Sequence, residues 1–209
     1  MNPLDQAILS VDNALRTLSG HSRGSGRPNP AANSADALLR PWERRRAARM
    51  MRVNHAGEVM AQALYTGQEM GTDDPELAKV LRKARAEEED HLRWCEERLD
   101  ELHGRPSLLG PLWYATAWGM GFLAARRGRG SNLGLVVAVE NLVEEHLKEH
   151  LQNLPVSDER SRRILEQMEA DERGHAEKAE SLGAVDLPTP VRVAMQSLSR
   201  IVTRGALWV

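Results

Sequence analysis

The sequence predicts an all-α protein, and three observations support this prediction. Phenylalanine, tyrosine and tryptophan make up only 4% of the 209 residues, while alanine, leucine, glutamate and arginine dominate. This composition favours helices over sheets. Apolar residues recur at steps of three and four along four long segments, which is helical periodicity. Two short turns join these segments in pairs, so the expected core is a four-helix bundle made of two helical hairpins.

Composition also excludes several classes of protein. The 28 basic and 30 acidic residues give a net charge of -2, so no nucleic-acid partner is expected. A single cysteine, Cys95, excludes an internal disulfide and a cysteine-rich zinc site, and fits a reducing compartment. Neither a secretory signal nor a clear transit peptide is recognisable at the N-terminus, so we expect the protein on the cytoplasmic side.

The predicted domain organisation has two parts. Residues 1–40 are expected to form an N-terminal helix over 3–19 and a flexible linker, because residues 20–33 are rich in glycine, serine and proline. Residues 41–209 are expected to form one domain. Its predicted helices cover 41–70, 75–103, 132–153, 158–182 and 189–206.

Both hairpin turns carry signals for the start of a helix. In the first turn, Asp74 is the predicted N-cap and Pro75 the first helical residue. In the second, Ser157 is the predicted N-cap, and Asp158 and Glu159 suit the first helical turn. Because both turns are short, the helices that each turn joins should be antiparallel neighbours.

Acidic residues and histidines interrupt the apolar faces of all four bundle helices. An unpaired buried carboxylate costs several kcal/mol, so partners must compensate these acids. Some of them could instead face solvent, since acidic residues are frequent nearby; the repeated pattern favours the interior. The six candidate residues are Glu58, Glu88, His91, Glu140, Glu172 and His175.

The spacing of these residues predicts that they meet. Glu88 and His91, like Glu172 and His175, are three residues apart and therefore share a helix face. Position 73, halfway between Glu58 and Glu88, lies in the first turn, and the second hairpin repeats this symmetry around position 156. Each hairpin thus presents one glutamate opposite a Glu-x-x-His motif, which is the ligand set of a carboxylate-bridged pair of metal ions. Oxygen and imidazole ligands suit iron, or less often manganese.

Two further acids directly precede the motif glutamates. Glu87 and Asp171 occupy equivalent positions in the two motifs. Histidines that bind metals usually donate their second N–H group to a carboxylate or a carbonyl. One hypothesis is therefore that each acid orients the histidine of the opposite helix, and the alternative is that each faces solvent.

An uncharged segment, residues 106–125, separates the two hairpins and is followed by three arginines. If it spanned a bilayer, the hairpins would lie on opposite sides and could not share one site. We therefore expect residues 107–129 to be a crossover that lies in a membrane interface, with Trp113, Tyr114 and Trp118 toward lipid. The alternatives are packing against the bundle and a dimer surface. The C-terminal stretch could join the same surface.

Glycine and proline predict the shape of the crossover. Pro111, Gly119 and Gly121 favour a broken segment over one straight helix. A substrate pocket is expected between this crossover and the bundle helices, near Tyr65 or Leu112.

Four motifs resemble those of the demethoxyubiquinone hydroxylase family. They are residues 52–58 (RVNHAGE) with the tract through Gln68, residues 88–91 (EEDH), residues 138–140 (AVE) and residues 171–175 (DERGH). The resemblance covers roughly residues 41–209, and residues 1–40 are expected to be a variable extension outside it.

The resemblance implies a ferritin-like four-helix bundle that contains two iron ions. It implies a bacterial monooxygenase of ubiquinone biosynthesis, peripheral to the cell membrane, that uses O₂ to hydroxylate a 2-polyprenyl-3-methyl-6-methoxy-1,4-benzoquinol. By the same resemblance one iron is bound by Glu58, Glu88 and His91, and the other by Glu140, Glu172 and His175, with Glu88 and Glu172 bridging.

Family members often have a His-Tyr pair six and seven residues after the glutamate of the third bundle helix. This chain has His146 and Leu147 there, so the role of that tyrosine does not carry over. His146 is either a residue that supports the metal site or a solvated histidine.

Other functions remain open at this stage. A ferritin- or rubrerythrin-like oxidase or peroxidase would use the same ligands, and a lipid-binding helical scaffold would use the apolar crossover. Assembly into a homo-oligomer or a ubiquinone-biosynthesis complex is also open.

Overall fold

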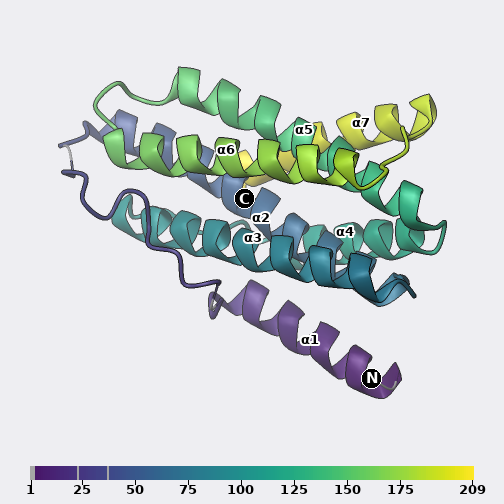
Figure 1. Cartoon of the computed structure of the whole chain (residues 1–209). Helices are drawn as coiled ribbons and strands as arrows, with labels where there is room; N and C mark the ends of the chain where they lie inside the picture. The colour runs from purple at the N-terminus through teal and green to yellow at the C-terminus, as the bar shows by residue number, and fades with distance from the viewer. Residues whose placement is uncertain (1–2, 23, 37) are drawn as a thin grey trace.

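The computed structural model describes residues 3–22, 24–36 and 38–209, and within these residues it contains seven α-helices and no strand. The predicted all-α class is confirmed, and most helix ends lie within two residues of the expected positions (Figure 1). The helices are α1 (Pro3–Ser19), α2 (Pro41–Gly71), α3 (Pro75–Glu101), α4 (Gly110–Ala125), α5 (Arg129–Asn153), α6 (Glu159–Ser181) and α7 (Thr189–Trp208).

Helices α2 and α3 form one hairpin, and α5 and α6 form the other. As predicted, Asp74 caps α3: its carboxylate accepts hydrogen bonds from the backbone N–H groups of Glu76 and Leu77, each at 3.0 Å. In the second turn the predicted cap, Ser157, is wrong by one residue. Asp158 caps α6 because its carboxylate accepts from the backbone of Ser161 and from buried Arg98 on α3.

Two apolar clusters fill the bundle on either side of its acidic centre. Along α3, one cluster contains Trp94 and Leu99 and the other contains Leu77 and Leu81, while Glu88 and its neighbours lie between them. All of these side chains are buried. The acidic residues are therefore enclosed by apolar packing rather than placed at an open end of the bundle.

The crossover contains a single uninterrupted helix, α4, and the predicted break does not occur. Pro111 lies in the first helical turn, where its missing N–H group is not needed. Gly121 faces α2, and a Cβ atom there would overlap the carbonyl oxygen of Leu64. On α2, a Cβ atom at Gly67 would likewise overlap the carbonyl oxygen of Trp118. These glycines therefore allow α2 and α4 to pack at short distance instead of interrupting the helix.

The expected lipid-facing aromatic residues of α4 point inward, and that prediction is corrected. Trp113 and Tyr114 are only 5% and 6% exposed. Trp113 packs beside Gly205 of α7, while the Trp118 indole is half-buried and donates a hydrogen bond to Ser10 of α1 at 3.1 Å. The two buried rings pack against other helices: Trp113 against Val202 and Ala206 of α7, and Tyr114 against apolar residues of α2. The exposed large apolar residues in and before α4 are Leu108, Leu112 and Leu123.

No helix in the described part of the chain combines the length and the apolar character that crossing a bilayer requires. Helix α1 lies at the edge of the bundle against α2 and α4 (Figure 1). Its Asn13 side chain donates hydrogen bonds to Thr66 on α2 and to Tyr114 on α4.

Residues 24–36, here called the strap, follow α1 and run along the bundle. Asn29 donates to Glu97 of α3 at 2.6 Å. Arg160 of α6 donates to the backbone carbonyls of Ala31 and Ser34 at 3.0 and 2.8 Å. This segment, which glycine, serine and proline content predicted as a linker, is thus held against both hairpins by specific hydrogen bonds.

Candidate metal centre

The six predicted residues converge between the two hairpins. Two sets of four side chains each bring their donor atoms within 4.8 Å of one another, a geometry that can hold a metal ion. Glu88 and Glu172 belong to both sets, as expected of bridging carboxylates. The carboxylates and His91 are at most 2% exposed. The sets are Glu58, Glu88, His91 and Glu172, and Glu88, Glu140, Glu172 and His175.

Helical periodicity selects these acids over their neighbours. Glu140 is buried on the face that Leu133 and Leu147 share, whereas Glu144 is only partly buried and pairs with Lys148 at 2.7 Å. The three-residue spacing within each Glu-x-x-His motif places both side chains toward the opposite hairpin. The local sequence therefore decides which acid turns inward, and hairpin packing brings the two halves together.

Both histidines direct Nδ1 toward the carboxylates. His91 Nδ1 lies 3.1 Å from Glu88 Oε2 and 3.3 Å from Glu172 Oε1. His175 Nδ1 lies 2.8 Å from Glu88 Oε1, but these two atoms do not have hydrogen-bond geometry. Within the described residues, four buried atoms of the cluster have no hydrogen-bond partner: Glu58 Oε2, Glu88 Oε1, Glu172 Oε2 and His175 Nδ1.

These unpaired atoms fit a metal site. A buried polar atom without a partner destabilises the fold by about 1–3 kcal/mol, and more when it is charged. Cations between the carboxylates would satisfy all four atoms at once. Four carboxylates balance the charge of two divalent ions, so the filled cluster would be formally neutral, which removes most of the cost of burying it.

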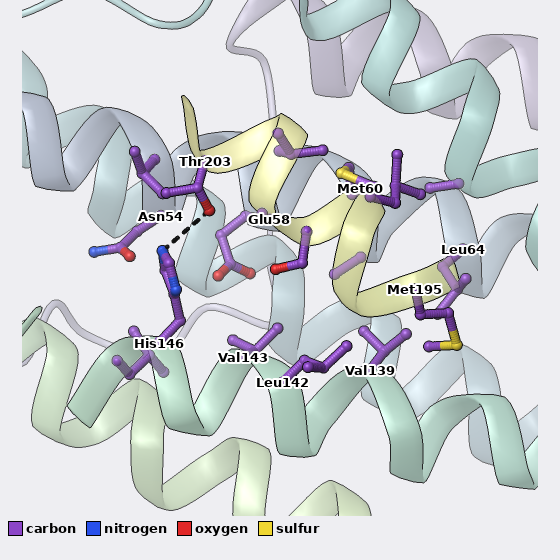
Figure 2. A pocket seen from close by; sticks show the side chains of 18 of the residues that line it. Asn54, Glu58, Met60, Leu64, Val139, Leu142, Val143, His146, Met195 and Thr203 are labelled. Atoms are coloured by element: carbon purple, nitrogen blue, oxygen red, sulfur yellow. Dashed lines mark hydrogen bonds between the residues drawn. The ribbon is translucent and has the colours of Figure 1, made fainter. Parts of the chain in front are cut away.

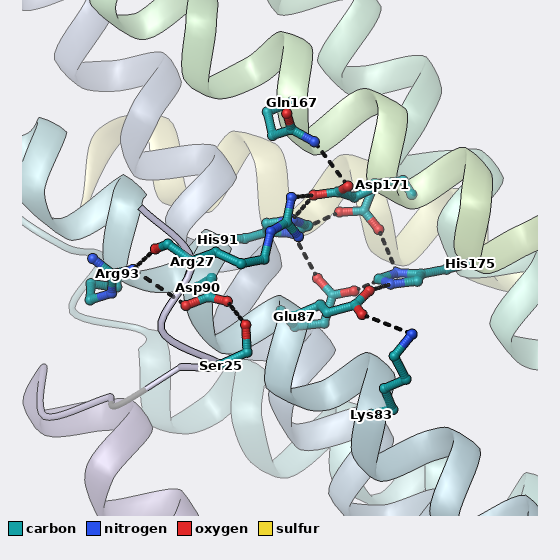
Figure 3. A network of polar contacts seen from close by, with 12 residues as sticks. Ser25, Arg27, Lys83, Glu87, Asp90, His91, Arg93, Gln167, Asp171 and His175 are labelled. Atoms are coloured by element: carbon teal, nitrogen blue, oxygen red, sulfur yellow. Dashed lines mark hydrogen bonds and ion pairs between the residues drawn. The ribbon is translucent and has the colours of Figure 1, made fainter. Parts of the chain in front are cut away.

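The second nitrogen of each histidine is held by an acid on the opposite helix (Figure 3). His91 Nε2 donates to Asp171 Oδ2 at 3.0 Å, and His175 Nε2 donates to Glu87 Oε2 at 2.8 Å. The contact of each acid with the opposite histidine, which the hypothesis requires, is present, and the solvent-facing alternative is excluded. The two contacts keep Nδ1 of both rings turned toward the carboxylates, where a metal ion would bind.

Tyr65 is a site residue whose role the sequence did not reveal. It lies seven residues after Glu58 on the same face of α2, and its hydroxyl donates a hydrogen bond to Glu140 Oε1. Burial and the nearby Glu140 carboxylate raise the pKa of Tyr65 well above its ordinary value, so the phenol keeps its proton. The seven-residue spacing was the available signal, because two helical turns place both side chains at the same interface.

Burial and mutual charge shift the pKa values of the clustered side chains. Burial, followed by the charge of a neighbouring carboxylate, raises the pKa of Glu58 and of Glu140 well above the usual value. Burial also acts to raise the pKa of Glu88 and of Glu172, but the two histidines outweigh it and lower both values. Burial acts to lower the pKa of His175, yet the surrounding carboxylates raise it to about 12.

An apolar cavity of about 120 Å³ leads to Glu58 (Figure 2). Residues of α2, α5 and α7 form its walls, and Glu58 is the one carboxylate among the described residues that line it. The crossover contributes Ala117 and Met120, whereas Leu112, expected at the pocket, does not line it. Tyr65 lines a second cavity of about 640 Å³, which reaches Glu87, Asp171 and His175 between α3 and α6.

His146 belongs to the wall of the first cavity rather than to the carboxylate cluster. Its Nε2 lies 3.3 Å from Thr203 Oγ1 on α7, and burial lowers its pKa. Leu147, the residue after it, is 1% exposed in the core. The contribution of α7 to this cavity was not predicted, because no motif in the C-terminal segment indicates that it lines a binding site.

Comparison with known proteins identifies relatives along almost the whole chain. Three of these relatives follow, and each is named 3-demethoxyubiquinol 3-hydroxylase. The protein from Bordetella avium is 50% identical over 204 residues, which are 98% of this chain and 94% of the relative. Those from Cupriavidus pinatubonensis and Ralstonia pickettii are 50% and 49% identical, and each alignment covers 97% of this chain and at least 98% of the relative.

These alignments extend into residues 1–40, so the expectation that this segment lies outside the resemblance is wrong for these relatives. Residues 45–208, which contain all six clustered side chains, match the family model described as ubiquinone biosynthesis protein COQ7. The family match and the identity over nearly full length agree, and the chain belongs to the COQ7 family of ubiquinone biosynthesis proteins.

Proposed function

We propose that this protein is a di-iron monooxygenase that uses O₂ to hydroxylate a demethoxyubiquinol, 2-polyprenyl-3-methyl-6-methoxy-1,4-benzoquinol, in ubiquinone biosynthesis. Relatives about 50% identical to it are named 3-demethoxyubiquinol 3-hydroxylase. The observation that carries the proposal is the buried cluster of four glutamates and two histidines at the inner end of an apolar cavity.

The proposed iron ligands are the six clustered side chains. Glu58, Glu88 and His91 would hold one ion, and Glu140, Glu172 and His175 the other, with Glu88 and Glu172 shared. When bound, a pair of ferrous ions supplies electrons for the reduction of O₂. Among the described residues, the cluster consists of carboxylates and imidazoles and includes no thiolate. This ligand set supports iron as the bound metal.

The chain itself would bind and orient the quinol. The cavity offers apolar walls to an aromatic ring, and Glu58 marks its contact with the metal cluster (Figure 2). Low polarity there excludes water and strengthens the electrostatic interactions of the cluster. Asp171 and Glu87 would keep the histidine rings oriented, and Tyr65 would hold Glu140.

A polyprenyl quinol is almost insoluble in water, so the enzyme must meet it at a bilayer. We infer a peripheral position on the cytoplasmic side of the cell membrane. The exposed leucines of the crossover support this contact, together with the neighbouring apolar face of α1. That face consists of Leu4, Ile8, Leu9, Val11, Leu15 and Leu18, and the exposed apolar residues of α7 could extend it.

The apolar cavity favours the hydroxylase over a ferritin- or rubrerythrin-like oxidase, which acts on small inorganic substrates and needs no cavity of this kind. Metal analysis of freshly purified protein, combined with an anaerobic quinol assay started by O₂, tests the proposal. We expect two iron ions per chain and hydroxylated quinol. Iron-loaded protein that consumes O₂ or peroxide without forming this product would be an oxidase or peroxidase, and metal-free protein that only binds quinol would be a scaffold.

A further inference from the structure

The strap reaches the candidate metal centre through Arg27. The Arg27 guanidinium lies 2.7 Å from Asp171 Oδ2, the same oxygen that accepts the hydrogen bond from His91 Nε2. The guanidinium also lies over the ring of Trp94, 5.2 Å from its centre, and Trp94 is in turn packed beside the His91 ring. Arg27 is therefore fixed by a charge contact and by stacking at one position beside the histidine.

The strap is anchored to the same turn of α3 that carries His91. Asp90 is completely buried and accepts hydrogen bonds from the Ser25 hydroxyl and from the backbone N–H of Gly26. Arg93 donates to the backbone carbonyl of Arg27 at 2.6 Å. The contacts thus form a closed ring: α3 holds the strap, Arg27 of the strap contacts Asp171, and Asp171 contacts His91 on α3 (Figure 3).

A glycine permits this close approach. Gly24 has a positive φ of 65°, a conformation that residues with side chains rarely adopt. A Cβ atom at this position would overlap the carboxylate of Asp90. The sequence of the strap therefore allows Ser25 and Arg27 to reach their partners, and a larger residue at position 24 would push the strap away from α3.

Among the residues that the structure describes, the acid beside the other histidine has no equivalent buried contact. Glu87, the acid that holds His175, pairs with Lys83 at 3.4 Å, and the Lys83 side chain is 83% exposed. Water competes strongly with such a pair, which therefore contributes little. Arg27 and Asp171 are only 31% and 17% exposed, so their contact is stronger. The two halves of the cluster are unequal because the strap covers one of them.

We propose that Arg27 is a positioning residue that fixes the His91 ring through Asp171 and makes the half-site of Glu58, Glu88 and His91 the tighter of the two for a divalent cation. This inference rests on the proposed metal function. Partners that orient a metal-binding histidine typically change metal affinity by 10- to 100-fold. Arg27 acts one contact further away, so we expect an effect at the lower end of this range.

Anaerobic titration of the full chain with Co²⁺, followed by visible absorption, tests the proposal. The wild-type protein should bind two ions in two separable steps. Arg27→Gln, which removes the charge, should weaken the tighter step about tenfold and leave the other step unchanged. Arg27→Lys should restore part of the loss. Lys83→Gln is the matched control, and it should leave both steps unchanged because its pair is exposed.

A second control separates positioning from folding of the strap. Asn29→Ala removes the contact between the strap and Glu97 but none of the contacts of Arg27. If Asn29→Ala weakens Co²⁺ binding as much as Arg27→Gln does, or if Arg27→Gln binds as the wild type does, the positioning role is overturned. A wild-type chain that binds no Co²⁺ overturns the metal centre itself, so the two failures are distinguishable.

Discussion

Tyr65 on α2 donates its hydroxyl hydrogen to Glu140 on α5, and this bond ties the first hairpin to the second at the level of the metal cluster. Both side chains are buried, at 1% and 2% exposure. The position of Glu140 is thereby fixed by Tyr65, which is not part of any predicted metal-ligand motif.

Tyr65→Phe should therefore leave one oxygen of Glu140 without its partner. We expect the free energy of unfolding of the metal-free protein to fall by about 1–2 kcal/mol, measured by denaturant titration. Metal affinity should fall as well, because Glu140 loses its orientation. Tyr114→Phe is the control: it removes a hydroxyl that accepts from Asn13 and should leave metal affinity unchanged. Wild-type stability in Tyr65→Phe would contradict a role for this hydrogen bond.

Glu172→Ala should abolish quinol hydroxylation and lower the iron content. Glu88 and Glu172 are the two glutamates that belong to both sets of donor atoms. The loss of Glu172 should therefore affect both ions. Glu169→Ala, on the same helix, removes a half-buried acid that pairs with Arg173 and should behave as the wild type. Iron analysis and product formation measure the effect. Full activity of Glu172→Ala would refute the ligand assignment.

Gly121→Ala should destabilise the fold, whereas Gly119→Ala should not. A methyl group at position 121 would overlap the backbone of Leu64, so α4 would have to move away from α2; such overpacking typically costs about 1–3 kcal/mol. At position 119 a Cβ atom meets nothing within 4 Å, and alanine favours a helix by about 1 kcal/mol over glycine. Urea unfolding of both variants compares these effects. Equal stabilities would show that α2 and α4 do not pack so closely.

The combined change Leu112→Glu and Leu123→Glu should weaken binding to vesicles of anionic phospholipid. These side chains are 56% and 58% exposed and are eleven residues apart, which places them on one face of α4. Val156→Glu, in the turn between α5 and α6, changes a residue that is 94% exposed and provides the control. Sedimentation with vesicles measures bound protein. Undiminished binding of the double variant would direct the search for a membrane surface away from α4.

His150 should make the fold less stable in acid. Burial lowers the pKa of His150 to about 3, and its Nδ1 contacts Asn54 Oδ1 at 2.8 Å. In the unfolded chain the pKa returns to about 6.5, so between these values the unfolded state binds the extra proton and stability falls as the pH falls.

Between pH 7 and pH 5 this effect should lower the free energy of unfolding by about 2 kcal/mol. Denaturant titrations at the two pH values should therefore show a smaller loss for His150→Gln than for the wild type. An identical loss in both proteins would mean that the pKa of His150 is the same in the folded and unfolded states.

The sequence alone determined the secondary structure and the identity of the inward-facing acids. Glu140 ends the apolar run LGLVVAVE, which favours it over Glu144 as the inward-facing acid, and the symmetry of the hairpin turns aligns Glu58 with Glu88. These relationships are local or concern helices joined by short turns, so residue spacing is sufficient to predict them. The same spacing made the crosswise contacts of Asp171 and Glu87 possible, but the structure decided between them and a solvent-facing position.

Only the tertiary structure decided what lies around the bundle. Trp113 packs against Val202 and Ala206 of α7, and Tyr114 meets Asn13 of α1, and the helical pattern of α4 does not specify these neighbours. Arg27 meets Asp171 although 144 positions separate them in the chain. Contacts of this range depend on how hairpins, crossover and strap fill space together, and local patterns of charge and hydrophobicity do not encode that arrangement.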